Sequence, residues 1–151
     1  MPPTSPYLKA RDLKIPPHNI EAEKALLGSI MIRPDVMHDV MDVINAQTFY
    51  SNQNRAIWTV IAELHLKTAP IDLLSVSARL KEHGTLEDSG GMAYLSEIIN
   101  SVHSSVNASH YAEIVEKKYV MRELLRVAEQ ITGFGYDEES DLHELLENVF
   151  A

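Results

Sequence analysis

The stretch that organises this chain is residues 107–150, NASHYAEIVEKKYVMRELLRVAEQITGFGYDEESDLHELLENVF. Apolar residues recur at helical spacing on both sides of Gly133-Phe134-Gly135. The pattern predicts a long helix that begins at Asn107, a turn at residues 133–135, and a second helix over about residues 139–151. Two helices alone cannot bury a core. This hairpin therefore has to pack on a body formed by the rest of the chain, and it needs a second surface to contact.

The long helix carries two apolar stripes. At about 100° per residue, the first stripe lies around Tyr111, and the second lies more than about a third of a turn away and spans roughly 160°. The first contains Ala108, Tyr111, Ile114 and Val115, and the second contains Val120, Met121, Leu124, Leu125, Val127, Ala128 and Ile131. One flat surface cannot cover both stripes. We therefore expect the helix to divide near Tyr119, with the first half packed on the body and the second half facing partners.

The second helix offers only a narrow stripe in return, formed by Leu142, Leu145, Leu146, Val149 and Phe150. Part of the wide stripe should then stay exposed, which usually marks an interaction surface. The residues predicted to make the hairpin self-associate are Met121, Leu124, Ala128, Leu142, Leu145, Leu146 and Val149. The alternative is that the hairpin folds flat on the body and hides this surface.

The rest of the chain predicts a tail and a helical head. Residues 1–17 hold five of the seven prolines, which favours a flexible, extended tail. The pattern over residues 18–106 predicts five helices: one capped by Asn19, then 34–44, 53–67, 73–83 capped by Asp72, and 92–100. No segment alternates with period two between turn signals, so the predicted fold class is all-α, a compact multi-helix globular head followed by a helical hairpin spanning 107–151.

Composition limits the function. The 151 residues include no Cys, which excludes disulfides and thiolate zinc sites, and no apolar run is long enough for a membrane span. A net charge of −9 disfavours general binding to nucleic acid. The densest basic group is Lys117, Lys118, Arg122 and Arg126 on the long helix.

Catalytic motifs are absent from the sequence. None of the six glycines precedes a lysine as a phosphate-binding loop requires, and the seven histidines are dispersed. Glu21 and Glu23 fit the ordinary preference of acids for the first turn of a helix, which favours capping over a metal or acid–base pair. We therefore predict no catalytic, cofactor-binding or metal-binding residues.

The residues IPPHNIEAEKALLG (15–28) resemble the opening of the N-terminal domain of the bacterial replicative DNA helicase family, DnaB. The resemblance continues through Phe49-Tyr50 and the segments PIDL (70–73), GGMAYL (90–95) and YAEIV (111–115). The motor domain of that family carries a phosphate-binding loop, which this chain lacks. Because the second helix reaches Ala151 without a stop signal, we expect a fragment that ends before the family's linker and motor domain.

The resemblance implies an assembly and docking domain. In the family, such domains form the collar of a hexameric ring, pair through their hairpins and dock the C-terminal domain of primase. The matching partner-binding positions are Tyr94, Leu125 and Ile131. The resemblance also implies a cytoplasmic, nucleoid-associated helicase that uses ATP and Mg, contacts DNA through its motor domain, and has initiator or loader proteins as further partners.

Two other hypotheses stay open. A stand-alone helical adaptor could use the same hairpin to bind a helicase or transcription partner. Direct binding of single-stranded DNA would use Lys117, Lys118, Arg122 and Arg126, against the acidic charge of the chain.

Overall fold

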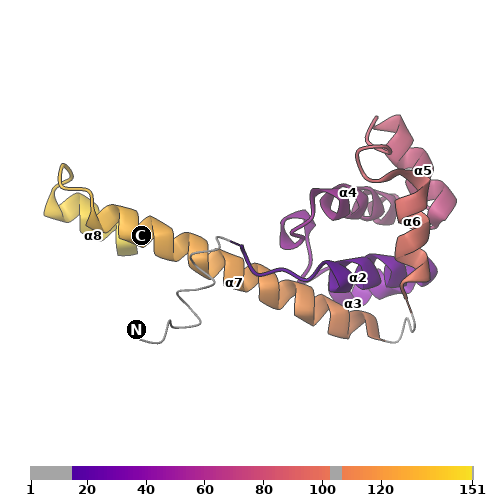
Figure 1. Ribbon diagram of the computed structural model, residues 1–151, viewed down its shortest axis with the longest axis horizontal. Helices are drawn as coiled ribbons and strands as arrows, with labels where there is room; N and C mark the ends of the chain where they lie inside the picture. The colour runs from indigo at the N-terminus through magenta and orange to yellow at the C-terminus, as the bar shows by residue number, and fades with distance from the viewer. Residues whose placement is uncertain (1–14, 103–106, 151) are drawn as a thin grey trace, which may run out of the picture. The chain divides into compact units, whose positions relative to one another are not determined.

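The computed structural model describes residues 15–102 and 107–150, and these residues form helices and connecting segments without a strand (Figure 1). The α-helices are α2 (Ile20–Ile32), α3 (Met37–Val40), α4 (Asn52–Leu66), α5 (Leu73–Glu82), α6 (Gly91–Asn100), α7 (Ala108–Gly135) and α8 (Leu142–Phe150). Two short 3-10 helices, η1 (Pro34–Val36) and η2 (Ala46–Thr48), lie between them. The all-α prediction is confirmed. The first fourteen residues of the predicted tail lie outside the described residues.

The chain divides into two units within α7. Residues 18–119 form the first, which we call the head unit. Residues 120–150, with the described residues 15–17, belong to the second, which we call the hairpin unit. The boundary falls at Tyr119–Val120, where the apolar stripe of the long helix changes direction.

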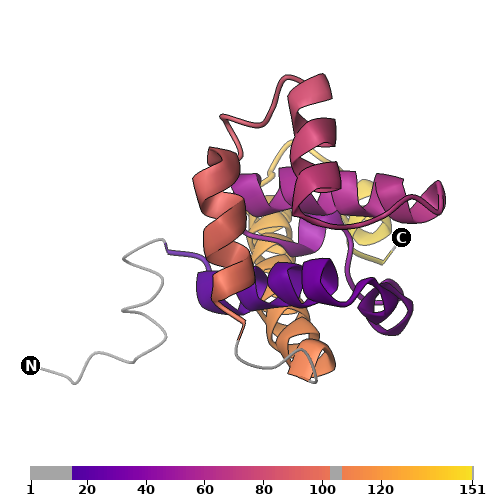
Figure 2. The ribbon, with the colours of Figure 1, turned by 90° about the vertical axis from the view of Figure 1, so that its right-hand side faces the viewer.

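Helix α2 is the centre of the head unit. Every residue from Ala22 to Met31 is buried, because α6 and α4 both pack on this helix (Figure 2). Gly28 permits the close approach of α6: a Cβ there would lie 2.5 Å from both the carbonyl oxygen of Ile98 and a methyl group of Val102. The local signals also act as predicted, since the side chain of Asn19 accepts a hydrogen bond from the backbone N–H of Ala22 at 3.0 Å.

The remaining head helices close the core around α2. The apolar face of α4, which includes Trp58, is buried, and Asp72 caps α5 by accepting from the backbone N–H of Ser75 at 2.8 Å. Ala108, Ala112 and Val115 of α7 join the same core. The first half of the long helix therefore packs on the head, as its first stripe predicted.

Two predicted elements differ from the structure. The helix expected over 34–44 is a 3-10 turn followed by a short α-helix that ends at Val40, and Met41 is exposed. The turn expected at Gly133-Phe134-Gly135 is helical, because α7 continues to Gly135. The reversal instead occupies residues 136–141, so α8 begins at Leu142 rather than near residue 139.

Inside the head, two apolar positions also face outward contrary to expectation. The apolar pattern of residues 73–83 predicts Leu74 on the inner face with Leu73, Val76 and Leu80, but Leu74 is 76% exposed in the first turn of α5. The adjacent aromatic residues Phe49 and Tyr50 follow a predicted helix, and the sequence predicts that both fill the core. Phe49 is fully buried, whereas Tyr50 is exposed and its ring stacks on the ring of His18.

Candidate partner-binding surface

The second half of α7 carries a row of exposed apolar side chains. Leu124, Leu125 and Ile131 are 65%, 52% and 48% exposed, and Val120, Met121, Val127 and Ala128 are exposed as well. Burying an apolar side chain of this size is worth about 1.5–3 kcal/mol, so leaving several in water is costly for a single chain. The predicted wide stripe therefore exists as an uncovered surface in the described hairpin unit.

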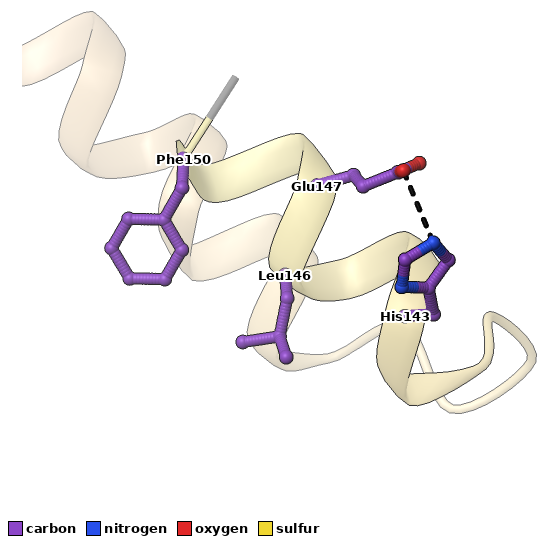
Figure 3. A pocket seen from close by; sticks show the side chains of 4 residues that line it. All are labelled: His143, Leu146, Glu147 and Phe150. Carbon is purple, nitrogen blue, oxygen red and sulfur yellow. Dashed lines mark ion pairs between the residues drawn. The ribbon is translucent and has the colours of Figure 1, made fainter.

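Helix α8 adds a second set of exposed apolar residues. It runs back in the opposite direction after the reversal at residues 136–141 (Figure 1) and has no buried residue. Leu142, Leu146, Val149 and Phe150 are all exposed, and only Leu145 of the predicted stripe is partly buried. Figure 3 shows Leu146 and Phe150 projecting from the same side of α8, where they line a shallow hollow with His143 and Glu147.

Polar contacts fix the geometry of the hairpin turn. The carboxylate of Asp137 accepts the backbone N–H groups of Glu139 and Ser140 and the hydroxyl of Ser140, and the bonds from Ser140 hold the pKa of that carboxyl below its ordinary value. The side chain of Asp141 caps α8 by accepting the N–H of Glu144 at 2.8 Å. These bonds fix the residue at which α8 begins. The hollow beside it includes an ion pair between Nε2 of His143 and Oε1 of Glu147 at 3.1 Å (Figure 3).

The three predicted partner-binding residues lie in different units. Leu125 and Ile131 are exposed on the hairpin unit, and Tyr94 lies on α6 of the head unit, where it is partly buried. The Tyr94 hydroxyl donates to Oδ1 of Asn54 at 2.6 Å, and burial raises the pKa of this phenol to about 12. Tyr94 therefore stays neutral and donates a hydrogen bond at physiological pH.

Sequence reasoning missed the group behind Tyr94. Asn54 is fully buried and donates from Nδ2 to Oε1 of Glu23 at 2.9 Å, while Glu23 is 1% exposed. Glu23 also accepts the backbone N–H groups of Tyr50 and Ser51. Glu23 lies in the first turn of α2, as its sequence position predicted, and in addition its carboxylate is buried and serves as an acceptor for groups outside its own helix. Every residue from Ala22 to Met31 is buried, so helical spacing alone gave no sign of this role of Glu23.

The two arginines of the basic group on α7 are engaged within the chain. Arg122 donates from a guanidinium nitrogen to the carbonyl oxygen of Pro17 at 2.8 Å, and Arg126 pairs with Glu123 at 3.0 Å. A phosphate contact at either arginine would have to replace one of these bonds. This arrangement gives no support to the hypothesis of single-stranded DNA binding.

The described residues contain no group of three or more His, Asp or Glu placed to hold a metal ion. Their most concentrated charge cluster lies between α4 and α5, where Glu63 accepts from Arg79, Lys67 and His83. These bonds, led by those from Arg79, lower the pKa of Glu63 from 4.5 to about 2. No helix among the described residues is long and apolar enough to cross a membrane.

Known proteins match both the sequence and the fold. Replicative DNA helicase DnaC of Bacillus subtilis is 37% identical over 133 residues, which cover 88% of this chain and 29% of the relative. The crystal structure of the N-terminal domain of DnaB helicase from Mycobacterium tuberculosis is 28% identical with a TM-score of 0.82, and covers 89% of this chain and 95% of that one. A structure of a DnaB-like replicative helicase, described with its interactions with primase, is 25% identical with a TM-score of 0.70, over 87% of this chain and 31% of that one.

The all-α fold described above is the class of domain that the M. tuberculosis structure shares with this chain. A family model described as the DnaB-like helicase N terminal domain matches residues 15–117. The chain belongs to this family of replicative helicase N-terminal domains. It spans about three-tenths of the length of the B. subtilis relative.

Proposed function

We propose that this domain assembles a ring-forming replicative helicase and docks primase onto it. The hairpin unit would pair with the hairpin unit of another subunit, and a ring of six subunits would carry the paired domains as a collar. The intact helicase would unwind DNA in the cytoplasm, at the nucleoid, using ATP and Mg held by its motor domain. Family membership and the interactions of the related DnaB-like helicase with primase support this proposal.

One observation carries the proposal: the exposed apolar surface of the hairpin unit. Leu124, Leu142 and Phe150 are each at least 65% exposed although they belong to two amphipathic helices. Contact with a second hairpin would remove such side chains from water and stabilise the pair. The residues assigned to this pairing are Met121, Leu124, Ala128, Leu142, Leu145, Leu146 and Val149.

Primase contact is assigned to Tyr94, Leu125 and Ile131. Leu125 and Ile131 lie on the exposed second half of α7, and large apolar and aromatic side chains dominate binding energy at protein interfaces. We assign the C-terminal domain of primase as the partner on the family resemblance, supported by the related helicase that interacts with primase. Initiator or loader proteins are further candidates for the same surface.

The test is Ile131→Asp. An unpaired carboxylate in an apolar interface should weaken self-association, primase binding, or both by roughly 2–4 kcal/mol. Self-association is measured by sedimentation equilibrium over a range of concentrations, and primase binding by titration calorimetry with the primase C-terminal domain. Circular dichroism checks that the helices remain folded.

Leu74→Asp is the matched control, because Leu74 is 76% exposed on the head unit and an acid is favourable in the first turn of α5. This variant should self-associate and bind as the unmodified chain does. If Ile131→Asp also behaves as the unmodified chain in both measurements, the assignment of function to the hairpin is wrong.

A further inference from the structure

A buried polar network holds the side chain of Tyr94 from behind. The hydroxyl of Tyr94 donates to Oδ1 of Asn54 at 2.6 Å, and Nδ2 of Asn54 donates to Oε1 of Glu23 at 2.9 Å. The other carboxylate oxygen of Glu23 accepts the backbone N–H of Tyr50 at 2.9 Å. Helices α2, α4 and α6 each supply one side chain, so Glu23 orients the amide of Asn54 and the amide oxygen in turn holds the Tyr94 hydroxyl.

The backbone fixes the base of the same side chain. A Cβ added to Gly90 would lie 2.5 Å from Cβ of Tyr94 and 2.8 Å from its Cγ. Gly90 has φ of +98°, a conformation that favours glycine, and its carbonyl oxygen accepts the N–H of Tyr94. The tyrosine is therefore held at both ends, by Gly90 at its base and by Asn54 at its hydroxyl.

We propose that Asn54, oriented by Glu23, is a positioning residue that presents the Tyr94 ring in one fixed orientation to the partner protein. This inference rests on the proposed function, because it assumes that Tyr94 contacts primase. Asn54 itself is fully buried and has no surface to offer a partner, so its effect passes through the Tyr94 hydroxyl.

A tyrosine that is already fixed in the free protein should bind a partner at a lower cost in conformational entropy. Immobilising a side chain at an interface costs about 0.5–1.5 kcal/mol, and an anchor that is already fixed avoids this cost. Tyrosine suits the role because its ring is large and has few rotatable bonds. A core that served only stability would not require a buried carboxylate and a buried amide, since apolar side chains of the same volume avoid their desolvation.

The experiment is a double-mutant cycle of Asn54→Leu and Tyr94→Phe in the full 151-residue chain. Leucine approximates the volume of asparagine but accepts no hydrogen bond, and phenylalanine keeps the ring but has no hydroxyl. Each single variant should weaken binding of the primase C-terminal domain about threefold to tenfold. Because both remove the same bond, the double variant should bind as weakly as either single variant and no more weakly.

A stability-matched control separates positioning from simple destabilisation. Val76→Ala removes buried methyl groups from α5 and keeps both partners of the hydrogen bond between Tyr94 and Asn54. It should lower the Tm and leave primase affinity unchanged at temperatures well below that Tm. If Val76→Ala weakens binding as much as Asn54→Leu does, or if the losses in the double variant multiply, the positioning role is overturned.

A second readout does not depend on primase. The ring signals of Tyr94 in NMR spectra of tyrosine-labelled protein should be those of a fixed ring in the unmodified chain and of a mobile ring in Asn54→Leu. If the unmodified chain does not bind primase, the proposed partner is wrong, and ring mobility alone decides whether Asn54 positions Tyr94. If the ring stays fixed in Asn54→Leu, the positioning role is overturned whatever the binding result.

Discussion

The two halves of α7 are made of similar residues and have different surroundings. Ala112 and Val115 are 2% exposed in the core of the head unit, whereas Leu124 and Leu125 are more than half exposed in the hairpin unit. One uninterrupted helix contains all four. The comparison teaches that helical periodicity decides which side chains share a face, while only a neighbouring surface decides whether that face is buried.

Two glycines show the same difference between the head unit and the hairpin unit. Gly28 lies where α6 approaches α2 so closely that no side chain fits, and Gly133 lies on α7 with no atom near enough to oppose a side chain. Both are helical. The packing of α6 on α2 requires a glycine at the first position. The second position lies on an open surface that has room for a side chain.

Replacing a leucine by alanine should give the largest difference in stability between the head unit and the hairpin unit. Leu27→Ala removes a fully buried side chain from α2 and should lower the free energy of unfolding by about 2.7–5 kcal/mol. Leu125→Ala should change it by about 0.5 kcal/mol or less, because that side chain is 52% exposed and alanine favours the helix. Urea denaturation at low protein concentration measures both. Equal losses would mean that Leu125 is covered within the single chain.

Glycine substitution should give opposite signs in the two units. Gly28→Ala places a Cβ against the backbone of Ile98 and should destabilise the head by about 1–3 kcal/mol. Gly133→Ala meets nothing within 4 Å and should stabilise α7 by about 0.5–1 kcal/mol. Calorimetric unfolding measures the two changes. A stabilising Gly28→Ala would contradict the close contact between α2 and α6.

Lowering the pH should give the smallest of these changes in stability. It should act on the head unit through the carboxylate of Glu63. Its pKa is lowered from 4.5 to about 2, so the folded head holds this carboxylate charged where the unfolded chain protonates it. The stabilisation is therefore complete above about pH 4.5 and is lost as the pH falls toward 2. Glu63→Gln should flatten this part of the dependence of Tm on pH, followed by the fluorescence of Trp58, which is the one tryptophan of the sequence and lies buried in α4.

Asp137→Asn is the matched control for the acid measurement. Asp137 also has a lowered pKa, but it belongs to the turn of the hairpin unit and not to the unit that contains Trp58. Its replacement should leave the acid transition seen by Trp58 unchanged. A shift as large as that of Glu63→Gln would show that the two units unfold together.

Errors in the expected fold have a common cause. Gly133 and Gly135 suggested a turn because isolated glycines weaken helices, yet the chain continues as a helix through both and reverses where Asp137 and Asp141 supply side-chain acceptors. Glu23 looked like an ordinary first-turn acid, and Leu74 like a core residue. In each case the local pattern was interpreted correctly, and the neighbours of the segment were unknown.

The sequence by itself determined the all-α class, most of the helices, the caps at Asn19 and Asp72, and the division of apolar residues along the long helix. These features depend on residues a few positions apart, whose spacing a sequence displays directly. Only the tertiary structure decided that Glu23 is buried, that Asn54 joins it to Tyr94, and that the second half of α7 is uncovered. Those outcomes depend on contacts between residues tens of positions apart, and local spacing does not encode them.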